Sequence, residues 1–455
     1  MNPLLREVLP ELGLSTGYAA AHLELVPASF LPAALPVGTL ANGAVGAAAI
    51  AALALRGGER AQVDPRQVAA SFRSDQLSSV DGRVEPGFAP LSGFFEAADG
   101  WVRTHANYPH DRDRLLRAVD LPEGATREDA AAVVRRWSAQ ELEDAVARDH
   151  GVAVRVRSLR EWMAGEQAAA VARHPVLAVR RAEGPAPAQL RARPRVLDLT
   201  RVIAGPVATR TLAFVGCDVL RVDPPRLPEL EAAHLDTDSG KRSTLMDLHN
   251  EHARAALHEL LDSADVVVTG YRPGALHAFG LDADQLARTH PHLVCATVSA
   301  WGTAGPWGTR RGFDSIVQAA TGIAEIESGG GGRPGALPAQ ALDHASGYLL
   351  AAGVLAALRR RESEGGSWQV SVHLARTAHW VLQTDALDGP ARALRDDDLE
   401  PLLVSARTER GLVRQPRPAF RLDEGPREFA WVGHRWGVDE AGWVDSTGWA
   451  HPPKG

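Results

Sequence analysis

The residue best placed to do chemistry is Asp343, near the start of a long run rich in alanine and leucine. This run, residues 336–358, opens around Pro338 and is apolar nearly all round, which predicts a buried helix. A carboxylate in the first turn is favoured by the helix dipole and by free backbone N–H groups. Such an aspartate could be a nucleophile, but from this segment alone a simple helix cap is the commoner role.

An internal repeat helps to decide whether Asp343 is a nucleophile or a helix cap. Residues 35–54 align without a gap on residues 337–356, and the likeness continues from Gly57 and Gly365. Chance likeness between two alanine-rich helices is the alternative. In the alignment Asp343 falls opposite Ala41, so one copy has a carboxylate that the other lacks. This difference favours a chemical role for Asp343 over a capping role.

Basic side chains make a second candidate group. They follow several predicted strands in a chain whose net charge is −7. If these loops converge they form a phosphate-binding rim, although solvated surface arginine is as common for any one of them. The residues are Arg201, Lys241, Arg242, Arg272, Arg310 and Arg311.

The elements that must position these residues alternate regularly from Arg195 onward. Continuous apolar strands separated by helices predict a parallel sheet covered on both faces. We expect a doubly wound, Rossmann-like unit of about six strands, with ligands at the carboxyl ends of the strands. No Gly-x-Gly-x-x-Gly or Walker sequence follows the first strand, so nicotinamide cofactors and nucleotide hydrolysis lack their usual phosphate loop. The expected strands are 196–199, 218–222, 240–248, 265–268 and 293–298.

Four segments are expected along the chain. The first is helical and carries the copy without the aspartate; the second is a small α/β domain, joined to the third by a linker rich in proline and alanine at 182–194. The third is the Rossmann-like domain with Asp343, and the fourth returns to complete the fold. Their bounds are 1–77, 78–190, 195–385 and 386–455.

Composition narrows the function classes. The charge is mildly negative over 455 residues, which gives no reason to expect nucleic acid or a membrane surface as partner. Cys217 and Cys295 lie in separate apolar runs, and no His/Cys cluster has metal-ligand spacing, so no metal site is expected. The N-terminus does not read as a secretory signal, and residues 41–55 are short for a membrane span. We therefore expect a cytoplasmic protein.

Several of these stretches together resemble the family III coenzyme A transferases, the CaiB/BaiF-like group that includes formyl-CoA and carnitine-CoA transferases and α-methylacyl-CoA racemases. The resemblance covers residues 195–385. The stretches that carry it are 196–206, 240–243, 264–274, 302–306, 312–314 and the Asp343 helix.

The resemblance implies roles for particular residues. Asp343 would be the covalent nucleophile, and three loops would hold the adenine, phosphates and pantetheine of coenzyme A, which is a substrate and not a permanent cofactor. Phe313 stands where racemases have histidine, which argues against racemisation. The run Gly329–Gly332 is longer than the usual turn before the nucleophile. The loop residues are Ile203, Ala204, Gly205, Pro206, Lys241, Arg242, Tyr271, Arg272 and Pro273.

The implied activity is transfer of CoA between an acyl-CoA and a carboxylic acid through an aspartyl intermediate. Backbone N–H groups at the start of the Asp343 helix or in the Gly329–Gly332 loop are candidate donors to the anionic intermediates. Two alternatives stay open: an acyl-CoA racemase or isomerase using His344, and a non-catalytic CoA-binding paralogue, because the chain order is permuted or partly duplicated. Residues 35–190 resemble the later half of the same family.

Assembly follows from the same resemblance, because family members form interlocked homodimers. We expect a homodimer with one reactive Asp343 per chain. The two alanine-rich helices are expected to pack as a pseudo-symmetric pair, either within one chain or across two.

Overall fold

A computed structural model describes residues 1–389 and 391–444 of the chain. Its centre is a seven-stranded sheet in the order β10-β9-β8-β11-β12-β13-β7. The strands from β8 to β13 are parallel, and β7 is antiparallel at the edge. This confirms the predicted α/β class with a Rossmann-like parallel sheet. In sheet order the strands are Arg242–Leu245, Asp218–Asp223, Arg195–Leu199, Val266–Thr269, Val294–Ser299, Ser367–His373 and Ala178–Ala182.

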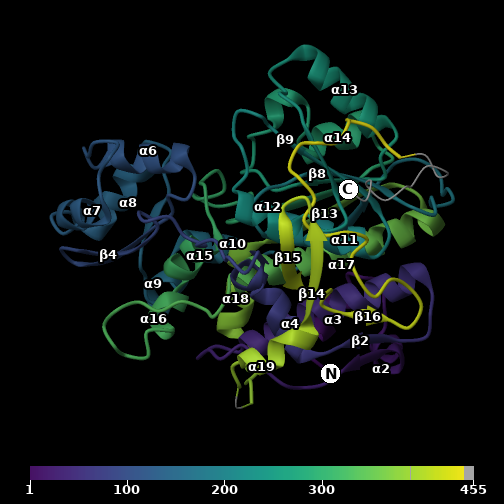
Figure 1. Ribbon diagram of the computed structural model, residues 1–455, viewed down its shortest axis with the longest axis horizontal. Coiled ribbons are helices and arrows are strands. Elements are labelled where there is room, and N and C mark those ends of the chain that lie inside the picture. Colours follow the sequence, from purple (N-terminus) through teal and green to yellow (C-terminus); the bar gives the residue numbers. More distant parts are fainter. Residues whose placement is uncertain (390, 445–455) are drawn as a thin grey trace.

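Alternate residues of the strands pack into two separate hydrophobic cores, one on each face of the sheet. Val196 and Val266 pack on the side of α11, α3 and α17, whereas Leu197 and Val267 pack on the side of α13 and α14. This is the period of two expected of a strand buried on both faces. Figure 1 shows α13 and α14 above the sheet, with α17 and α3 below it. The helices are α11 (Ala204–Phe214), α13 (Glu251–Asp262) and α14 (Ala283–Thr289).

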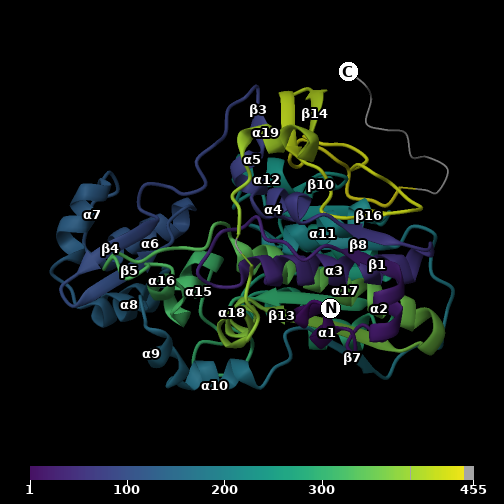
Figure 2. The same cartoon turned by 90° about the horizontal axis from the view of Figure 1, so that it is seen from below.

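The two alanine-rich helices lie side by side within one chain. They are α3 (Val37–Arg56) and α17 (Ala341–Glu364), which pack against each other (Figures 1 and 2). Both are long and apolar enough to cross a membrane by length and composition, but nearly all of each is buried in the fold. Helix α17 is buried at every position from 341 to 358 because it is packed by the sheet, α3 and α11.

Helix α17 approaches α11 closely at Gly347. A Cβ atom at this position would lie 2.5 Å from the carbonyl oxygen of Ala204 and 2.9 Å from Val207. Glycine is therefore required by space here, and the contact fixes the start of α11 relative to the start of α17. This contact matters for the site because both helix starts face the same cavity.

The small domain lies apart from the sheet, at the left of Figure 1. It has a three-stranded antiparallel sheet, three helices and a core of its own around Val102 and Leu142. Within the segment 78–190 that was predicted as this domain, β7 pairs with β13 and so belongs to the large sheet. The elements are β4 (Gly93–Ala97), β5 (Gly100–Thr104), α6 (Pro109–Ala118), α7 (Arg127–Val134), α8 (Ala139–Arg148) and β6 (Ala153–Arg155).

The first and last segments of the chain interleave. Strand β15 (Gly411–Pro416) pairs with β3 (Ser79–Val80), and β16 (Arg421–Leu422) pairs with β2 (Ala61–Val63). Residues 390 and 445–455 of the predicted C-terminal segment lie outside the described residues. The remaining strands are β1 (Leu23–Leu25) and β14 (Leu403–Thr408).

The remaining helices are short and connect these layers. Those near the cavity described below are α4 (Pro65–Phe72), α5 (Ser74–Leu77), α12 (Glu231–Thr237) and α15 (Asp314–Thr321). The others are α1 (Pro3–Val8), α2 (Thr16–His22), α9 (Leu159–Met163), α10 (Glu166–Ala172), η1 (His277–Phe279), α16 (Ile323–Ile326), α18 (Leu374–Gln383), α19 (Asp396–Leu399) and η2 (Glu400–Leu402).

Replacing Gly347 by Ala should lower the free energy of unfolding by about 1–3 kcal/mol, the usual cost of overpacking a core. Gly46→Ala on α3 is the matched control, because its Cβ would have no neighbour closer than 3.4 Å. That change should be neutral or slightly stabilising. Denaturant unfolding measures both, and equal losses would contradict the close approach of α17 and α11.

Candidate active site

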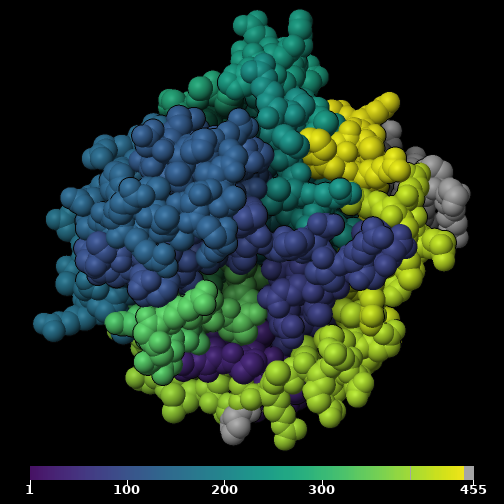
Figure 3. Space-filling view, turned by 60° about the vertical axis from the view of Figure 1, so that its left-hand side comes forward, coloured from purple at the N-terminus to yellow at the C-terminus, as the bar shows by residue number. Residues whose placement is uncertain are grey.

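A cavity of about 1350 Å³ opens between the small domain, the N-terminal segment and the loops of the large sheet. Figure 3 shows these parts meeting on one face of the molecule, where the blue small domain lies beside the teal loops. Eight carboxylic residues line the cavity. Four of them are the aspartates Asp75, Asp236, Asp314 and Asp343, and the other four are Asp81, Glu85, Glu229 and Glu231.

Asp343 occupies the first turn of α17, as predicted, and it is only 5% exposed. The backbone N–H of Asp343 donates to Oδ2 of Asp314 at 2.9 Å. Asp314 is the first residue of α15 and also accepts from the side-chain amide of Gln318. Asp314 therefore caps the start of α17 and holds the backbone of Asp343 in place.

The three carboxyls of Asp343, Asp314 and Asp75 influence one another. Burial, and then the charges of Asp314 and Asp75, raise the pKa of Asp343 well above its ordinary value. Burial raises the pKa of Asp314 to about 6, and burial together with Asp236 raises the pKa of Asp75 to about 7. These groups can hold protons near neutral pH, which is uncommon for carboxyls and typical of reactive sites.

Asp75 is a site residue that the sequence reasoning missed. It lies on α5, far from Asp343 in sequence, and Oδ1 is buried without a hydrogen-bond partner among the described residues. A single aspartate in a short polar helix gives no sequence signal of this placement. Only the fold brings it to the cavity.

His105 also lines the cavity. Its ring stacks flat on Phe313, with 3.6 Å between the ring centroids and 8° between the planes. Nδ1 has no hydrogen-bond partner among the described residues. Burial and the nearby Arg103 lower the pKa of His105 to about 3, so the ring is neutral at pH 7.

His344 does not face the cavity, although it follows Asp343 in sequence. It stacks against Phe72 at 5.2 Å and is fully buried. Burial lowers the pKa of this ring to about 3. His344 is therefore not a proton-transfer partner for a substrate at Asp343.

The loop after β8 reaches the cavity at Val202 and Ile203. Ala204, Gly205 and Pro206 form the buried first turn of α11 behind it. Val202 has φ of +72°, and its N–H donates to Glu229 at 3.2 Å. Of the four residues predicted in this loop, the structure brings Ile203 alone to the cavity wall.

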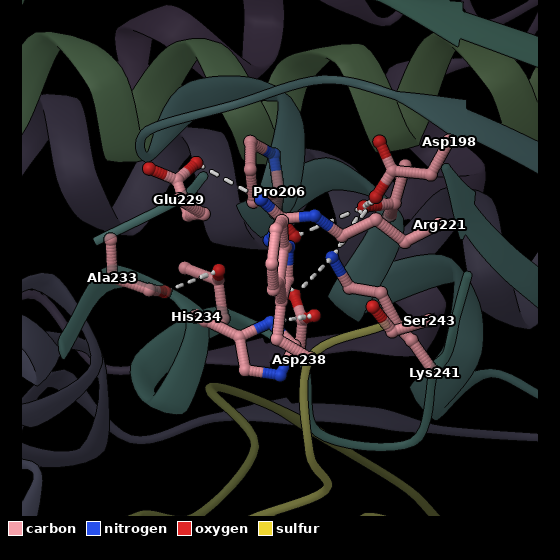
Figure 4. A network of polar contacts seen from close by, with 12 residues as sticks. Asp198, Pro206, Arg221, Glu229, Ala233, His234, Asp238, Lys241 and Ser243 are labelled. Carbon is pink, nitrogen blue, oxygen red and sulfur yellow. Dashed lines mark hydrogen bonds and ion pairs between the residues drawn. The ribbon is translucent and has the colours of Figure 1, made fainter. Parts of the chain in front are cut away.

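Lys241 is not at a binding rim, and the structure does not support its predicted phosphate contact. Its side chain is fully buried, and Nζ lies 2.8 Å from Thr209 Oγ1 and 3.1 Å from Asp198. Figure 4 shows this polar network in the interior. Arg242 is likewise engaged, with Asp218 at 3.1 Å and the carbonyl oxygen of Gly442 at 2.6 Å.

The centre of the network is Arg221, which the sequence did not single out. Its guanidinium is fully buried and pairs with Asp223 and Asp238 at 2.7 Å and with Glu229 at 2.9 Å. Glu229 also accepts from the hydroxyl of Tyr108, so the network reaches the cavity wall. Buried charges of this kind are stable only when they are paired in this way.

Three predicted basic residues, Arg201, Arg272 and Arg311, lie in the loops after β8, β11 and β12. Arg201 lies over the ring of Tyr108 at 4.8 Å and pairs with Glu229 at 3.5 Å. Arg311 pairs with Asp111 at 3.5 Å, and burial lowers its pKa. Arg272 is exposed and Tyr271 and Pro273 are partly exposed, in the loop after β11.

Their position agrees with the sheet order. Counted from β8, the parallel strands lie in the order 3-2-1-4-5-6, and the order reverses between β8 and β11. Ligands of doubly wound folds bind in the crevice at this reversal. Arg310 lies apart from the group, paired with Glu143 at 2.9 Å.

The glycine loop Gly329–Gly332 is exposed and does not line the cavity. Near it, Glu327 accepts from the N–H groups of Ala34 and Leu35 at 3.1 Å each. The loop is therefore not a source of oxyanion donors in this structure. Among residues 1–389 and 391–444, no group of three or more His, Cys, Asp or Glu side chains is suited to hold a metal ion.

Comparison with known proteins gives a consistent result over part of the chain. Residues 192–400 match the family described as CoA-transferase family III. A probable fatty acyl-CoA transferase of Mycobacterium tuberculosis is 34% identical over 246 residues, which are 51% of this chain and 62% of that protein. The formyl-CoA:oxalate CoA-transferase of Streptomyces coelicolor is 32% identical over 189 residues, 39% of this chain and 46% of that protein.

The chain thus spans less than two thirds of the length of these relatives. A crystal structure of a hypothetical protein from Mycobacterium tuberculosis shares 37% identity, with a TM-score of 0.40. That match covers 44% of this chain and 58% of the other. The fold assignment therefore rests on the sheet described above.

Replacing Lys241 by Met should lower the free energy of unfolding by about 3–5 kcal/mol, because it leaves the buried carboxylate of Asp198 without its cation. Arg272→Ala, at an exposed position, should change stability by less than about 0.5 kcal/mol. Chemical denaturation of both variants is the measurement. Similar small effects for the two would contradict a structural role for Lys241.

Proposed function

Since residues 192–400 belong to CoA-transferase family III, we propose that this protein moves coenzyme A between an acyl-CoA and a carboxylic acid, with Asp343 as the covalent nucleophile. The observation that carries the proposal is the position of Asp343. Its carboxyl lies in the first turn of a buried helix and lines a cavity large enough for a thioester and an acid. The carboxyl ends of the strands open beside it.

The proposed exchange has four steps. A carboxylate oxygen of Asp343 attacks the thioester carbonyl, the C–S bond breaks, and a mixed anhydride and CoA thiolate form. The thiolate attacks the aspartyl carbonyl of the anhydride, which releases the donor acid and leaves an enzyme–CoA thioester. The acceptor carboxylate attacks that thioester and frees the thiolate again. The thiolate attacks the acceptor acyl group, which gives the new acyl-CoA and restores Asp343.

Asp314 is proposed to position Asp343. It holds the N–H of Asp343 at 2.9 Å, so this N–H is not free to bind an oxyanion. Asp343 can attack only as the carboxylate, and its raised pKa means that it must first lose a proton. The raised pKa also makes the carboxylate more basic, and so more nucleophilic, than an exposed aspartate.

The CoA phosphates are proposed to bind Arg201, Arg272 and Arg311, which lie in the loops after the neighbouring strands β8, β11 and β12. Clustered guanidinium groups suit phosphate oxygens, which they contact in pairs of charge-assisted hydrogen bonds. Ile203 and Tyr271 would contact the rest of coenzyme A. Lys241 and Arg242 are left out of this site because their partners lie at 2.6–3.1 Å in the interior. Arg201 and Arg311 are also paired with acids, but at the longer distance of 3.5 Å.

The two alternative functions are less well supported. A racemase needs a base beside Asp343, but Phe313 stands at the expected position and His344 faces Phe72. A non-catalytic CoA-binding protein would not need a buried carboxyl with a raised pKa. Calorimetric titration with CoA, together with a transferase assay, distinguishes these functions.

We also propose that the protein forms a homodimer and is located in the cytoplasm.

Asp343→Asn should abolish CoA transfer but keep CoA binding. Hydroxylamine trapping during turnover should label the peptide with Asp343 in the native protein and leave the variant unlabelled. A variant that transfers CoA at a comparable rate would rule out the covalent mechanism.

Asp343→Asn should also raise the free energy of unfolding at pH 8. A carboxyl whose pKa is raised by folding opposes folding once the pH exceeds its unfolded pKa, and asparagine removes that effect. Asp236→Asn is the matched control and should lower stability, because Asp236 accepts from Ser74 and Ser78 and pairs with Arg210.

The pH dependence of kcat/KM should reflect the same carboxyl. The rate should rise with pH over a range above the ordinary aspartate pKa of about 3.9, because the ionised form of Asp343 attacks. Asp75→Asn removes one of the charges that raise the pKa of Asp343, so the rising limb should move to lower pH. A limb that stays in place or moves to higher pH would contradict the coupling of Asp75 and Asp343.

A further inference from the structure

We propose that Arg103, with His105 beside it, binds the carboxylate of the acid substrate. Arg103 lies in β5 and His105 directly after it, so the two side chains are on the same face of the small sheet. The inference rests on the proposed function and identifies the residues that hold the acid. Four features of this part of the molecule support it.

The first feature is that Arg103 is a buried cation without an acidic partner. Among the described residues four arginines are at least nine-tenths buried, and Arg157, Arg210 and Arg221 each pair with a carboxylate at 3.5 Å or less. Arg103 is 8% exposed, and within the same residues its side chain forms no ion pair or hydrogen bond. Because a buried charge is costly unless it is paired, this guanidinium suits an anion that comes from outside the chain.

The second feature is the set of neighbours around the guanidinium. Its Cζ lies 4.7 Å from the ring centroid of Phe88 and 4.9 Å from that of Phe94. An aromatic face attracts the positive charge but offers no oxygen to the N–H groups, and Nε is buried without a partner among the described residues. The N–H groups of arginine form a planar fork that matches the two oxygens of a carboxylate.

The third feature is the access to the cavity. His105 lines the cavity, is 4% exposed, and has Nδ1 without a partner in the part of the chain that the structure describes. Burial, and then the charge of Arg103, lower the pKa of His105, so the neutral ring can donate one hydrogen bond. Phe88 also lines the cavity and is 40% exposed. The guanidinium therefore lies next to two residues of the cavity wall.

The fourth feature is the connection to the reactive aspartate. Helix α15 packs against β5 and begins at Asp314, whose carboxylate accepts the N–H of Asp343 at 2.9 Å. Burial raises the pKa of Asp314 to about 6, while the charge of Arg103 acts in the opposite direction. In the proposed exchange Asp343 is an uncharged CoA thioester when the acceptor acid arrives. A carboxylate held by Arg103 then approaches a neutral carbonyl group.

The position of Arg103 favours a carboxylate over a CoA phosphate as its anion. The arginines proposed for the phosphates lie in loops of the large sheet, whereas Arg103 belongs to the small domain and acts on Asp314. The site of acyl exchange is at Asp343, so the anion needed nearby is the acid.

Butyrate and butyramide test the proposal, because they share a carbon skeleton and differ in a carboxylate and an uncharged amide. Ligand-observed NMR titration uses Asp343→Asn, in which position 343 is uncharged as in the CoA-bound enzyme. Butyrate should bind more tightly than butyramide. Adding Arg103→Met should raise the Kd of butyrate by about tenfold or more and leave that of butyramide unchanged, because charge-assisted hydrogen bonds are lost. Adding Arg103→Lys should give an intermediate Kd for butyrate, since it keeps the charge but not the fork.

Arg127→Met is the matched control. The Arg127 guanidinium lies in the same domain, 4.4 Å from the ring centroid of Phe95, but it donates to the carbonyl oxygens of Pro90, Ser92 and Phe94. Because its N–H groups are already bound within the fold, Arg127→Met should leave the Kd of butyrate unchanged.

The outcomes separate this proposal from the proposed function. Equal binding of butyrate and butyramide, or a Kd of butyrate unchanged by Arg103→Met in a folded variant, overturns the carboxylate site. If Arg103→Met does not fold, Arg103→Lys decides: weaker butyrate binding supports the site and an unchanged Kd overturns it. Weaker CoA binding with unchanged butyrate binding assigns Arg103 to a phosphate and also overturns it.

Calorimetric titration of the unmodified protein with CoA tests the proposed function by itself. If CoA does not bind while butyrate binds through Arg103, the proposed function fails and the carboxylate site stands.

Discussion

The burial of helix α17 on all sides is the constraint on which the rest of the structure depends. A helix without a polar face must be surrounded, and the sheet, α3 and α11 together surround it. Because α17 cannot shift, the first turn that carries Asp343 is held against the cavity. The same burial removes solvent from the carboxyl, so its position and its raised pKa have one physical cause.

The buried acids of this protein fall into two groups, which differ in whether a cation is paired with them. Asp223, Asp238 and Glu229 surround Arg221 and are neutralised by it. Asp75, Asp314 and Asp343 at the cavity form no ion pair among the described residues, and their pKa values are raised instead. The paired acids stabilise the loops after β8 and β9, whereas the unpaired ones are available for reaction. Both sets meet near Glu229 and Tyr108, so a structural network supports one wall of the reactive cavity.

Local patterns in the sequence were enough to predict the parallel sheet, the buried helix and the place of Asp343, because period and capping are short-range properties. Local patterns could not show that Lys241 is buried while Arg272 is exposed, since both residues lie in or near loops between strands. Lys241 is buried because it pairs with Asp198 and Asp238, which are its neighbours only in the folded protein. Asp75 and His105 reach the cavity through long-range folding. The antiparallel pairing of β7 with β13 is also long-range, so local patterns could not predict that β7 joins the large sheet.

The pairing of α3 with α17 has a consequence for how the chain is made. Helix α3 ends at Arg56 and its partner begins at Ala341, so the ribosome must add almost 300 residues before the two can meet. At about 5–20 residues per second, this interval is on the order of 15–60 s. During this interval the apolar helix α3 lacks its packing partner α17. Synthesis of this fold therefore depends on temporary contacts that bury the apolar surface of α3, made by the nascent chain itself or by a chaperone.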